Sequence, residues 1–384
     1  MTWCPTDGHD YALGPSSMTI TDPFILRRSC ITLALAMVGL GCGPKAPPPK
    51  TPEPAPVEAA APEPEPEPEP PPPKVPDDAI SVGTFNLDWA YDPLEDRRPK
   101  AAQDHTSPDD AAWEWKRNQI ADVLIAEDLD VVVLTELGGT RELTDITATV
   151  SAKDGPDYAY AWVESEDRRT GHQVAILSRF PIDEERRTDA YAPVHVVGDV
   201  ELPNGQRVTI VGVHLPEGGN KGATKKRLEV ANSLKRRINK ESKTHPVIVA
   251  GTVGDATLPL DDGYARSAAG VLSGASTSKG SDDCEDSAAE GLAQATTVGE
   301  GAAMDRIFSC GLEMRRAEVS GRDLIVRQTE DPAGTPWPAT PTDAEPHRDV
   351  SDHLVLWAEV VRPKAPEPET EPGGDGSGDA AGSG

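Results

Sequence analysis

The sequence predicts an α/β domain in which two mixed β-sheets pack face to face, with helices on the outside. Two observations lead to this fold class. Runs of apolar and β-branched residues outnumber helical segments between Asp78 and Arg362, a length near the upper end for one domain. The helices are also too few for one to follow every strand, as an alternating βα barrel requires.

The chain is organised around the run Leu129–Glu136, Leu-Asp-Val-Val-Val-Leu-Thr-Glu. Its four consecutive apolar residues, three of them Val, predict a strand buried on both faces. The preceding segment, Trp113–Glu127, gathers its apolar residues on one helical face. The strand ends at Glu136, and ligands of open α/β sheets bind at strand ends. A single Glu there is usually a solvated acid, so its role depends on polar residues elsewhere.

The other elements follow from the same patterns. Ile80–Leu87 alternates and predicts the first strand, and Ala90–Ala112 is expected to be a polar loop. After the central strand we expect a helix at Arg141–Val150, strands at Tyr158–Glu164 and Gln173–Ser178, a hairpin of Val194–Leu202 and Arg207–Leu215 around Pro203-Asn204-Gly205, a helix at Ala223–Ile238, and strands at Pro246–Ala250, Met304–Ser309, Glu318–Val319 and His353–Val360. Asp261–Ala303 has weak periodicity and is expected to be a long acidic insertion.

The segments outside the domain predict export. Arg27-Arg28, the apolar run Ser29–Gly41 and Cys42 resemble a bacterial lipoprotein signal, in which the cysteine carries lipid after cleavage. A plain secretory signal is the alternative, and Met18 is an alternative start. We therefore expect residues 1–42 to be a signal peptide of lipoprotein type and the protein to be an envelope lipoprotein.

Two further segments outside the domain are expected to be disordered. Residues 43–77 are rich in Pro and Glu, and at about 3.1 Å per residue they would form a spacer on the order of 100 Å long. Residues 363–384, acidic and then rich in Gly and Ser, predict a disordered tail.

Two cysteines remain inside the domain, Cys284 and Cys310. In an oxidising compartment these two are predicted to form a disulfide that closes the intervening loop. No C-x-x-C pair is present, which argues against a structural zinc site.

Five polar clusters follow or precede apolar runs in the predicted domain. They are Asn86-Leu87-Asp88, Glu136, Val213-His214-Leu215, Met304-Asp305 and Ser351-Asp352-His353. This set suits metal-assisted attack of water on a phosphoester, because a carboxylate holds a hard cation while a His, fixed by a second carboxylate, orients or activates water. His172, with Arg168 and Arg169, could face substrate, but loop surface is its expected place; His195, His245 and His347 are expected to be packing or surface residues.

At these residues the chain resembles the endonuclease/exonuclease/phosphatase superfamily, the deoxyribonuclease I-like fold, over nearly all of Asp78–Arg362. The matching pieces are Thr84-Phe85-Asn86, Asp130–Glu136, Ala175–Ile182, Val213-His214-Leu215, Arg227 in the following helix, and Ser351-Asp352-His353. The resemblance implies a four-layer α/β/β/α sandwich with the site at one edge of the paired sheets. It also implies that Glu136 is the principal ligand of Mg²⁺ or Mn²⁺, with Ca²⁺ as an alternative and Asn86 and Asp88 beside it.

The resemblance also implies roles for the remaining polar residues. His214 would contact the scissile phosphate. Asp305 would pair with His353, which serves as general base or phosphate ligand. Asp352 would assist at the metal.

One stretch departs from the family pattern. Members of the family end the strand after the basic helix with Gly-Asp-x-Asn, whereas here the strand runs into Gly251-Thr252-Val253-Gly254-Asp255. Aligned without a gap, Thr252 replaces the Asp and Gly254 replaces the Asn. A register shifted by three residues would instead place Asp255 on the Asp. We favour the ungapped alignment, because three strand residues move a side chain by about 10 Å.

Two functions remain open from the sequence. One is an exported, membrane-tethered, metal-dependent phosphoesterase; the other is a catalytically impaired family member that serves as an envelope binding module. The net charge of −28 repels nucleic acid, so a small phosphodiester or a lipid headgroup is the expected partner and the chain is expected to be a monomer. The basic stretch Lys221–Lys240 is a local exception, which a solvated helix face explains.

Overall fold

A computed structural model describes most of the predicted domain. The described residues are 79–93, 98–103, 105–164, 167–183, 195–216, 218–259, 261–277, 283–288, 296–298, 303–326 and 349–361. The predicted signal peptide with Cys42, the linker, the tail and His347 lie outside these residues. Among the helices that the structure describes, none has the length and apolar character needed to cross a bilayer.

The first sheet contains the strand predicted at Leu129–Glu136. Its strands, in spatial order, are β11 (Glu313–Ser320), β12 (Val355–Val361), β1 (Ala79–Ala90), β2 (Val131–Leu137), β4 (Gln173–Ser178) and β3 (Tyr160–Glu164). β1 and β2 are parallel, and the other neighbours are antiparallel, so the sheet is mixed. β2 is buried along its whole length, as its run of Val predicts.

The second sheet has the same number of described strands. In spatial order they are β5 (Ile182–Asp183), β6 (His195–Glu201), β7 (Arg207–His214), β8 (Val247–Thr252), β10 (Asp305–Cys310) and β9 (Glu285–Asp286). The predicted hairpin is β6–β7, and here too one central pair, β7 and β8, is parallel.

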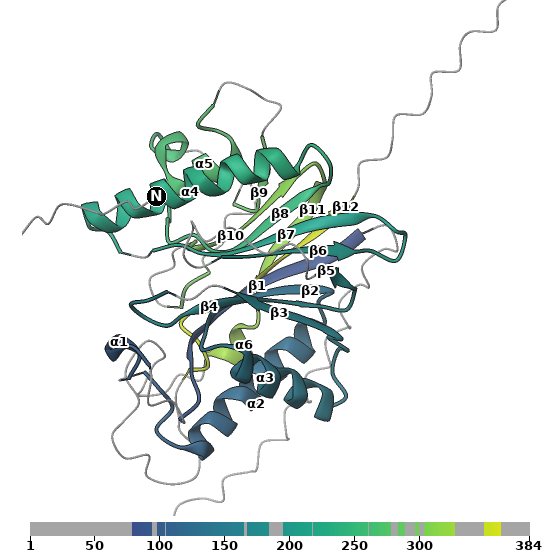
Figure 1. The fold of residues 1–384 in the computed structure, drawn as a ribbon, viewed down its shortest axis with the longest axis vertical. Helices are drawn as coiled ribbons and strands as arrows, with labels where there is room; N and C mark the ends of the chain where they lie inside the picture. Colours follow the sequence, from purple (N-terminus) through teal and green to yellow (C-terminus); the bar gives the residue numbers. More distant parts are fainter. Residues whose placement is uncertain are drawn as a thin grey trace, which may run out of the picture. The chain divides into compact units, whose positions relative to one another are not determined.

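The two sheets pack directly on each other between layers of helices (Figure 1). Val133 of β2 and Ile248 of β8 belong to one buried apolar cluster, which fills the space between the sheets. A Cβ at Gly212 of β7 would lie 3.0 Å from the Val133 side chain, which shows how closely the sheets approach. The predicted sandwich of two mixed sheets with outer helices is therefore confirmed.

The described residues form six helices and one 3₁₀ turn. They are α1 (Lys100–Gln103), α2 (Asp110–Glu127), α3 (Thr140–Ala152), α4 (Lys221–Glu241), the 3₁₀ turn Tyr264–Arg266, α5 (Ala268–Ser273) and α6 (Arg322–Ile325). α2 and α3 cover the first sheet, while α4 and α5 cover the second (Figure 1). α2 begins earlier than predicted because the Asp109 side chain accepts a hydrogen bond from Ala112 N and caps the helix. The segment predicted to be a polar loop, Ala90–Ala112, also contains the short helix α1.

The segment predicted to be an acidic insertion holds two short elements, α5 and β9, that the sequence pattern did not predict. Ala269 and Leu272 of α5 are buried against α4 and the second sheet. Asp286 of β9 is also buried, with Oδ1 3.7 Å from Nη1 of the fully buried Arg306 of β10. Small Ala and Gly residues carry too little hydropathy for periodicity to reveal such a short helix. β11 is also longer than predicted, because charged residues on its exposed face mask the strand pattern.

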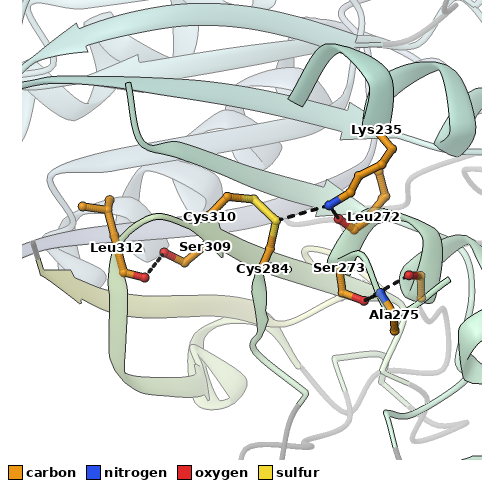
Figure 2. The surroundings of a disulfide bond; sticks show 9 residues. Lys235, Leu272, Ser273, Ala275, Cys284, Ser309, Cys310 and Leu312 are labelled. Carbon is orange, nitrogen blue, oxygen red and sulfur yellow. Dashed lines mark hydrogen bonds between the residues drawn. A yellow bond between two sulfur atoms is a disulfide. The ribbon is translucent and has the colours of Figure 1, made fainter. Parts of the chain in front are cut away.

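A disulfide joins Cys284 and Cys310, the pair expected from the sequence (Figure 2). The closed loop spans a sequence separation of 26 residues, so loop-closure entropy corresponds to about 3.5 kcal/mol of stability. Lys235 of α4 lies beside it, with Nζ 3.6 Å from Cys284 Sγ and 3.1 Å from Leu272 O. The disulfide therefore ties the segment before β10 to the second sheet beneath α4.

Candidate active site

The predicted site residues meet where central strands of both sheets end. In the second sheet, Thr252 of β8 pairs in register with His214 of β7 and with Asp305 of β10. Gly251 permits this pairing, since it has a φ of 140° and a Cβ there would lie 1.9 Å from Val213 O. In the first sheet, Asn86 of β1 pairs with Thr135 of β2, next to Glu136 in the chain.

The backbone around Glu136 is irregular in both neighbouring strands. Glu136, Asp88 and Trp89 have φ values of 58°, 47° and 55°, in the left-handed region that side chains other than Gly rarely adopt. The register of β2 shifts against β1 and also against β4 at this level, which marks β-bulges. Such strain costs of order 1–3 kcal/mol per residue and concentrates at functional sites.

The Glu136 carboxylate lies at the centre of a buried cluster. Oε1 accepts a hydrogen bond from Asn86 Nδ2 at 3.0 Å and lies 3.3 Å from His214 Nε2. Oε2 accepts from Trp89 N at 3.2 Å and lies 3.7 Å from His172 Nε2. Burial by itself raises the pKa of Glu136, but the two imidazoles and the Asn86 amide outweigh it and hold the pKa well below its usual range. Glu136 is therefore ionised.

Thr252 links the two sheets at the bottom of the site. Its Oγ1 donates to Asp305 Oδ1 at 2.7 Å and lies 3.2 Å from Thr135 Oγ1, and Asn86 Nδ2 lies 3.3 Å away. Asp255, the alternative in the shifted register, lies elsewhere: it accepts hydrogen bonds from Thr257 and from Ala268 N. Of the two residues weighed from the sequence, the structure brings Thr252 into the site and leaves Asp255 in a loop contact.

The second carboxylate–histidine pair of the site is Asp305 with His353. Asp305 Oδ2 lies 2.5 Å from His353 Nδ1, and both residues are buried. Burial disfavours the imidazolium, but the Asp305 carboxylate outweighs it and raises the pKa of His353 to about 10. Burial would likewise raise the pKa of Asp305, and His353 lowers it below the ordinary value. At neutral pH the pair is thus an imidazolium beside a carboxylate.

The remaining predicted residues lie around these two pairs. Asp88 is buried, with Oδ2 3.7 Å from Lys116 Nζ of α2, and is not part of the Glu136 cluster. Asp352 is half-exposed, 3.8 Å from His353 Nε2. Arg227 of α4 donates to Pro216 O at 2.6 Å and to Gly218 O, so it holds the loop after His214.

Comparison of the sequence with family models identifies the family of this chain. The sequence model of the Endonuclease/Exonuclease/phosphatase family matches residues 83–353. This chain belongs to that family. No curated protein matches it.

Solved structures similar to this endonuclease/exonuclease/phosphatase chain share little sequence with it. One, an endonuclease/exonuclease/phosphatase from Beutenbergia cavernae, is 17% identical, with 76% of this chain and 73% of that chain covered and a TM-score of 0.49. A humanized TDP2 from D. rerio is 12% identical, with 74% of this chain and 99% of that chain covered and a TM-score of 0.48. A beta toxin from Staphylococcus aureus is 16% identical, with 73% of this chain and 99% of that chain covered and a TM-score of 0.46.

The donor set of this family member fits a divalent ion. One oxygen of Glu136 and one ring nitrogen each of His172 and His214 lie within 4.8 Å of one another, and all three residues are buried. A carboxylate and imidazoles are ordinary ligands of divalent metals. The cluster also lies beside the pair Asp305–His353, through Asn86 and Thr252. The Glu136 cluster and the Asp305–His353 pair are therefore adjacent.

Sequence reasoning missed two neighbours of this cluster, His172 and Trp89, and the buried Lys116 beside Asp88. His172, expected on a loop surface, is buried and lies against Glu136. It precedes β4, and because β4 runs antiparallel to β2, the start of β4 lies beside the end of β2. The antiparallel pairing of these two strands is the feature that could have placed His172 beside Glu136. Trp89, whose ring stacks on His105 at 4.2 Å, and the buried Lys116 carried no such signal, since each is one polar or aromatic residue inside an otherwise ordinary segment.

Proposed function

We propose that the chain is an exported, membrane-tethered, metal-dependent phosphodiesterase. One observation carries the chemistry: the ionised Glu136 cluster and the Asp305–His353 pair form one buried network through Asn86 and Thr252. Family membership supplies the reaction class, hydrolysis of phosphoesters. A divalent ion bound at Glu136 would polarise a phosphoryl oxygen and neutralise the charge that develops on it.

The residues of the chain supply the rest of the reaction. Asp305 accepts a hydrogen bond from Nδ1 of His353, and Nε2 then faces the half-exposed Asp352 at 3.8 Å. As an imidazolium, His353 donates from Nε2 to a phosphate oxygen and stabilises the charge that accumulates there. Asn86 holds the Glu136 carboxylate through Nδ2, and its Oδ1 accepts from Asp88 N, so the strained turn and the carboxylate are fixed together.

The neutral Thr252 is expected to make this phosphodiesterase slow. In the family pattern an Asp at this place orients the nucleophile or the leaving group. A threonine hydroxyl binds by hydrogen bonds without accepting a proton, and loss of a positioned acid–base group typically costs 10²–10⁴-fold in rate. The same observation favours the second candidate, a catalytically impaired member that acts as an envelope binding module.

The substrate and the location are proposals from charge and from the terminal segments. The chain carries a net charge of −28, which favours a small phosphodiester or lipid headgroup over long nucleic acid. A lipid on Cys42 and the Pro/Glu-rich residues 43–77 would hold the domain near a membrane surface, where lipid headgroups are the abundant phosphodiesters.

Activity of the full chain tests the chemistry. We expect Mg²⁺ or Mn²⁺ to support hydrolysis of a chromogenic phosphodiester faster than cleavage of plasmid DNA, and chelation to abolish it. No hydrolysis with Mg²⁺, Mn²⁺, Ca²⁺ or Zn²⁺ would contradict the phosphodiesterase. If the double substitution Thr252→Asp with Gly254→Asn then creates turnover, the impaired-member candidate is correct; Gly254 has a φ of 65°, which Asn tolerates better than most residues.

Membrane attachment is tested separately through Cys42. Mass spectrometry of the mature N-terminus should find lipid on Cys42, and Cys42→Ala should release the protein from the membrane fraction. Cys30→Ala is the matched control and should leave attachment unchanged. A mature protein without lipid at Cys42 would replace this proposal with an ordinary secretory signal.

A further inference from the structure

We propose that His172 completes a three-ligand metal site with Glu136 and His214, and that this site prefers a borderline transition ion of the Zn²⁺ class to Mg²⁺. The inference deepens the proposed function, on which it rests for the location of the ion. It departs from the expectation that an all-oxygen set around Glu136 holds Mg²⁺, and it gives His214 a ligand role in place of a phosphate contact.

The spacing of the three side chains carries the proposal. His214 Nε2 lies 3.3 Å from Glu136 Oε1, and His172 Nε2 lies 3.7 Å from Glu136 Oε2. Two ligand atoms that each lie about 2.1 Å from a tetrahedral ion are about 3.4 Å apart. A direct hydrogen bond would instead bring nitrogen and oxygen to about 2.9 Å. The two imidazoles thus face different oxygens of one carboxylate at separations close to that of two ligands of one ion, and one ligand atom of each of the three residues lies within 4.8 Å of the others.

The chemistry of the donors selects the ion. Two imidazole nitrogens and one carboxylate form a frequent ligand set of catalytic zinc, which leaves positions for water and substrate. Mg²⁺ prefers oxygen ligands in octahedral geometry and gives up its water reluctantly. Affinity at mixed nitrogen and oxygen sites also rises from Mn²⁺ toward the later transition ions. Asn86 does not restore an oxygen-rich set, because its Nδ2 faces Glu136 and its Oδ1 accepts from Asp88 N.

The His172 ring is held in place before any ion binds. The Trp89 ring meets it edge to face, with centroids 4.2 Å apart, and the Tyr91 ring lies at 5.9 Å. The turn before it is closed by Asp167, whose backbone N donates to His172 O at 2.9 Å and whose Oδ1 accepts from Arg169 N and Thr170 N. Tyr91 OH also donates to Thr170 O at 2.8 Å, so the turn is tied to the end of β1. A ligand fixed in this way loses little freedom when it binds.

The alternative is an ordinary ion pair, in which protonated His172 neutralises Glu136 and takes no part in metal binding. Both readings place His172 beside Glu136. They differ in what happens to ion affinity when the imidazole is removed, because a ligand contributes to Zn²⁺ affinity while a neutralising cation opposes it. Direct titration with metal therefore separates them.

The experiment is equilibrium titration of the metal-free full chain with Zn²⁺ and with Mg²⁺, read by calorimetry and by elemental analysis of the bound ion. We expect one Zn²⁺ per chain, bound at least about 100-fold more tightly than Mg²⁺. His172→Gln should weaken Zn²⁺ binding by at least about 100-fold, since even partners of ligands are worth 10–100-fold, and should change Mg²⁺ binding little. His105→Gln is the matched control, because His105 stacks on the same Trp89 ring and lies outside the triad.

Zinc-edge X-ray absorption of the wild-type chain gives a second measurement that needs no variant, in case His172→Gln does not fold. Scattering from two imidazoles is expected. Equal affinity for Zn²⁺ and Mg²⁺, Zn²⁺ binding that His172→Gln leaves unchanged or strengthens, or scattering from fewer than two imidazoles would each overturn the proposal. These outcomes concern binding alone, so a chain that binds Zn²⁺ as expected but hydrolyses no phosphodiester would contradict the proposed function and not this one.

Discussion

The site contains two carboxylate–histidine arrangements that differ in spacing. Asp305 and His353 touch through a hydrogen bond of 2.5 Å, while Glu136 stands 3.3 Å and 3.7 Å from His214 and His172. The closed pair, Asp305 with His353, has no room for an ion between its members and forms a charged pair. In the open cluster, Glu136 with His172 and His214, one possible ligand atom of each residue lies within 4.8 Å of the others. In the proposed function the same two residue types therefore place a proton in one half of the site and bind an ion in the other, and the separation between them distinguishes the two roles.

The open cluster should be the more sensitive half. Glu136→Gln keeps the shape of the side chain but removes the charge, so we expect phosphodiesterase activity to fall by at least about 10³-fold. Glu127→Gln is the control, because Glu127 ends α2, accepts a hydrogen bond from Ser320 of β11 and should leave the rate unchanged. Steady-state kinetics at saturating metal measures both. A Glu136→Gln enzyme with near wild-type rate would show that no ion acts at this carboxylate.

The closed pair should respond most clearly in its proton affinity. In Asp305→Asn we expect the pKa of His353 to fall from about 10 to its ordinary 6.5 or below, because burial then acts without the carboxylate. His353 has a raised pKa, so its contribution to stability is full below about pH 6.5 and is lost as the pH rises through 10. The lowered pKa of Asp305 adds stability above its ordinary 3.8, lost as the pH falls through the lowered value. Imidazole NMR and unfolding at several pH values measure these changes; a His353 that already titrates near 6.5 in the wild type would contradict the pairing.

Removal of His353 should lower the rate less than removal of Glu136. We expect His353→Gln to cost about 10²-fold in kcat, since a charge-stabilising donor is typically worth 10²–10³-fold. Adding Asp305→Asn to His353→Gln should lower kcat little further, because the effects of residues that act as one unit are not additive. The control is His195→Gln, a buried histidine of β6 outside both arrangements. Fully additive losses in the double variant would mean that the two residues act independently.

The smallest expected effect concerns the link between the two halves. Thr252→Val removes the hydroxyl that bonds Asp305 and contacts Asn86 and Thr135, so we expect a loss of about 1–3 kcal/mol in the free energy of unfolding. Thr84→Val is the matched control: Thr84 is also fully buried on β1, and its hydroxyl has no hydrogen-bond partner among the described residues, so the change should be neutral or stabilising. Chemical denaturation measures both. Equal effects of the two substitutions would show that Thr252 bonds nothing of consequence.

The sequence predicts both members of the Asp305–His353 pair but only two of the three residues in the Glu136 cluster. Glu136, His214, Asp305 and His353 each border an apolar run, and the family resemblance connects them. His172 follows a Gly before a strand and looks like a loop residue, because only the antiparallel pairing of β4 with β2 brings it to Glu136. Likewise, periodicity finds the long elements but not α5, whose Ala and Gly residues are buried by their neighbours rather than by their own hydropathy. Spacing between side chains, which separates the open cluster from the closed pair, is not written in any local pattern.

The bulges beside Glu136 limit how the length of this chain can change. Between Asn86 and Ala90, β1 has more residues than the facing part of β2, and between Leu134 and Leu137, β2 has more than the facing part of β4. Deletion of one residue from the latter stretch would repair the ladder and turn the Glu136 carboxylate toward the opposite face of the sheet. Natural variants of this protein should therefore gain or lose residues in their surface connections while these few positions keep a constant count, even where their side chains differ.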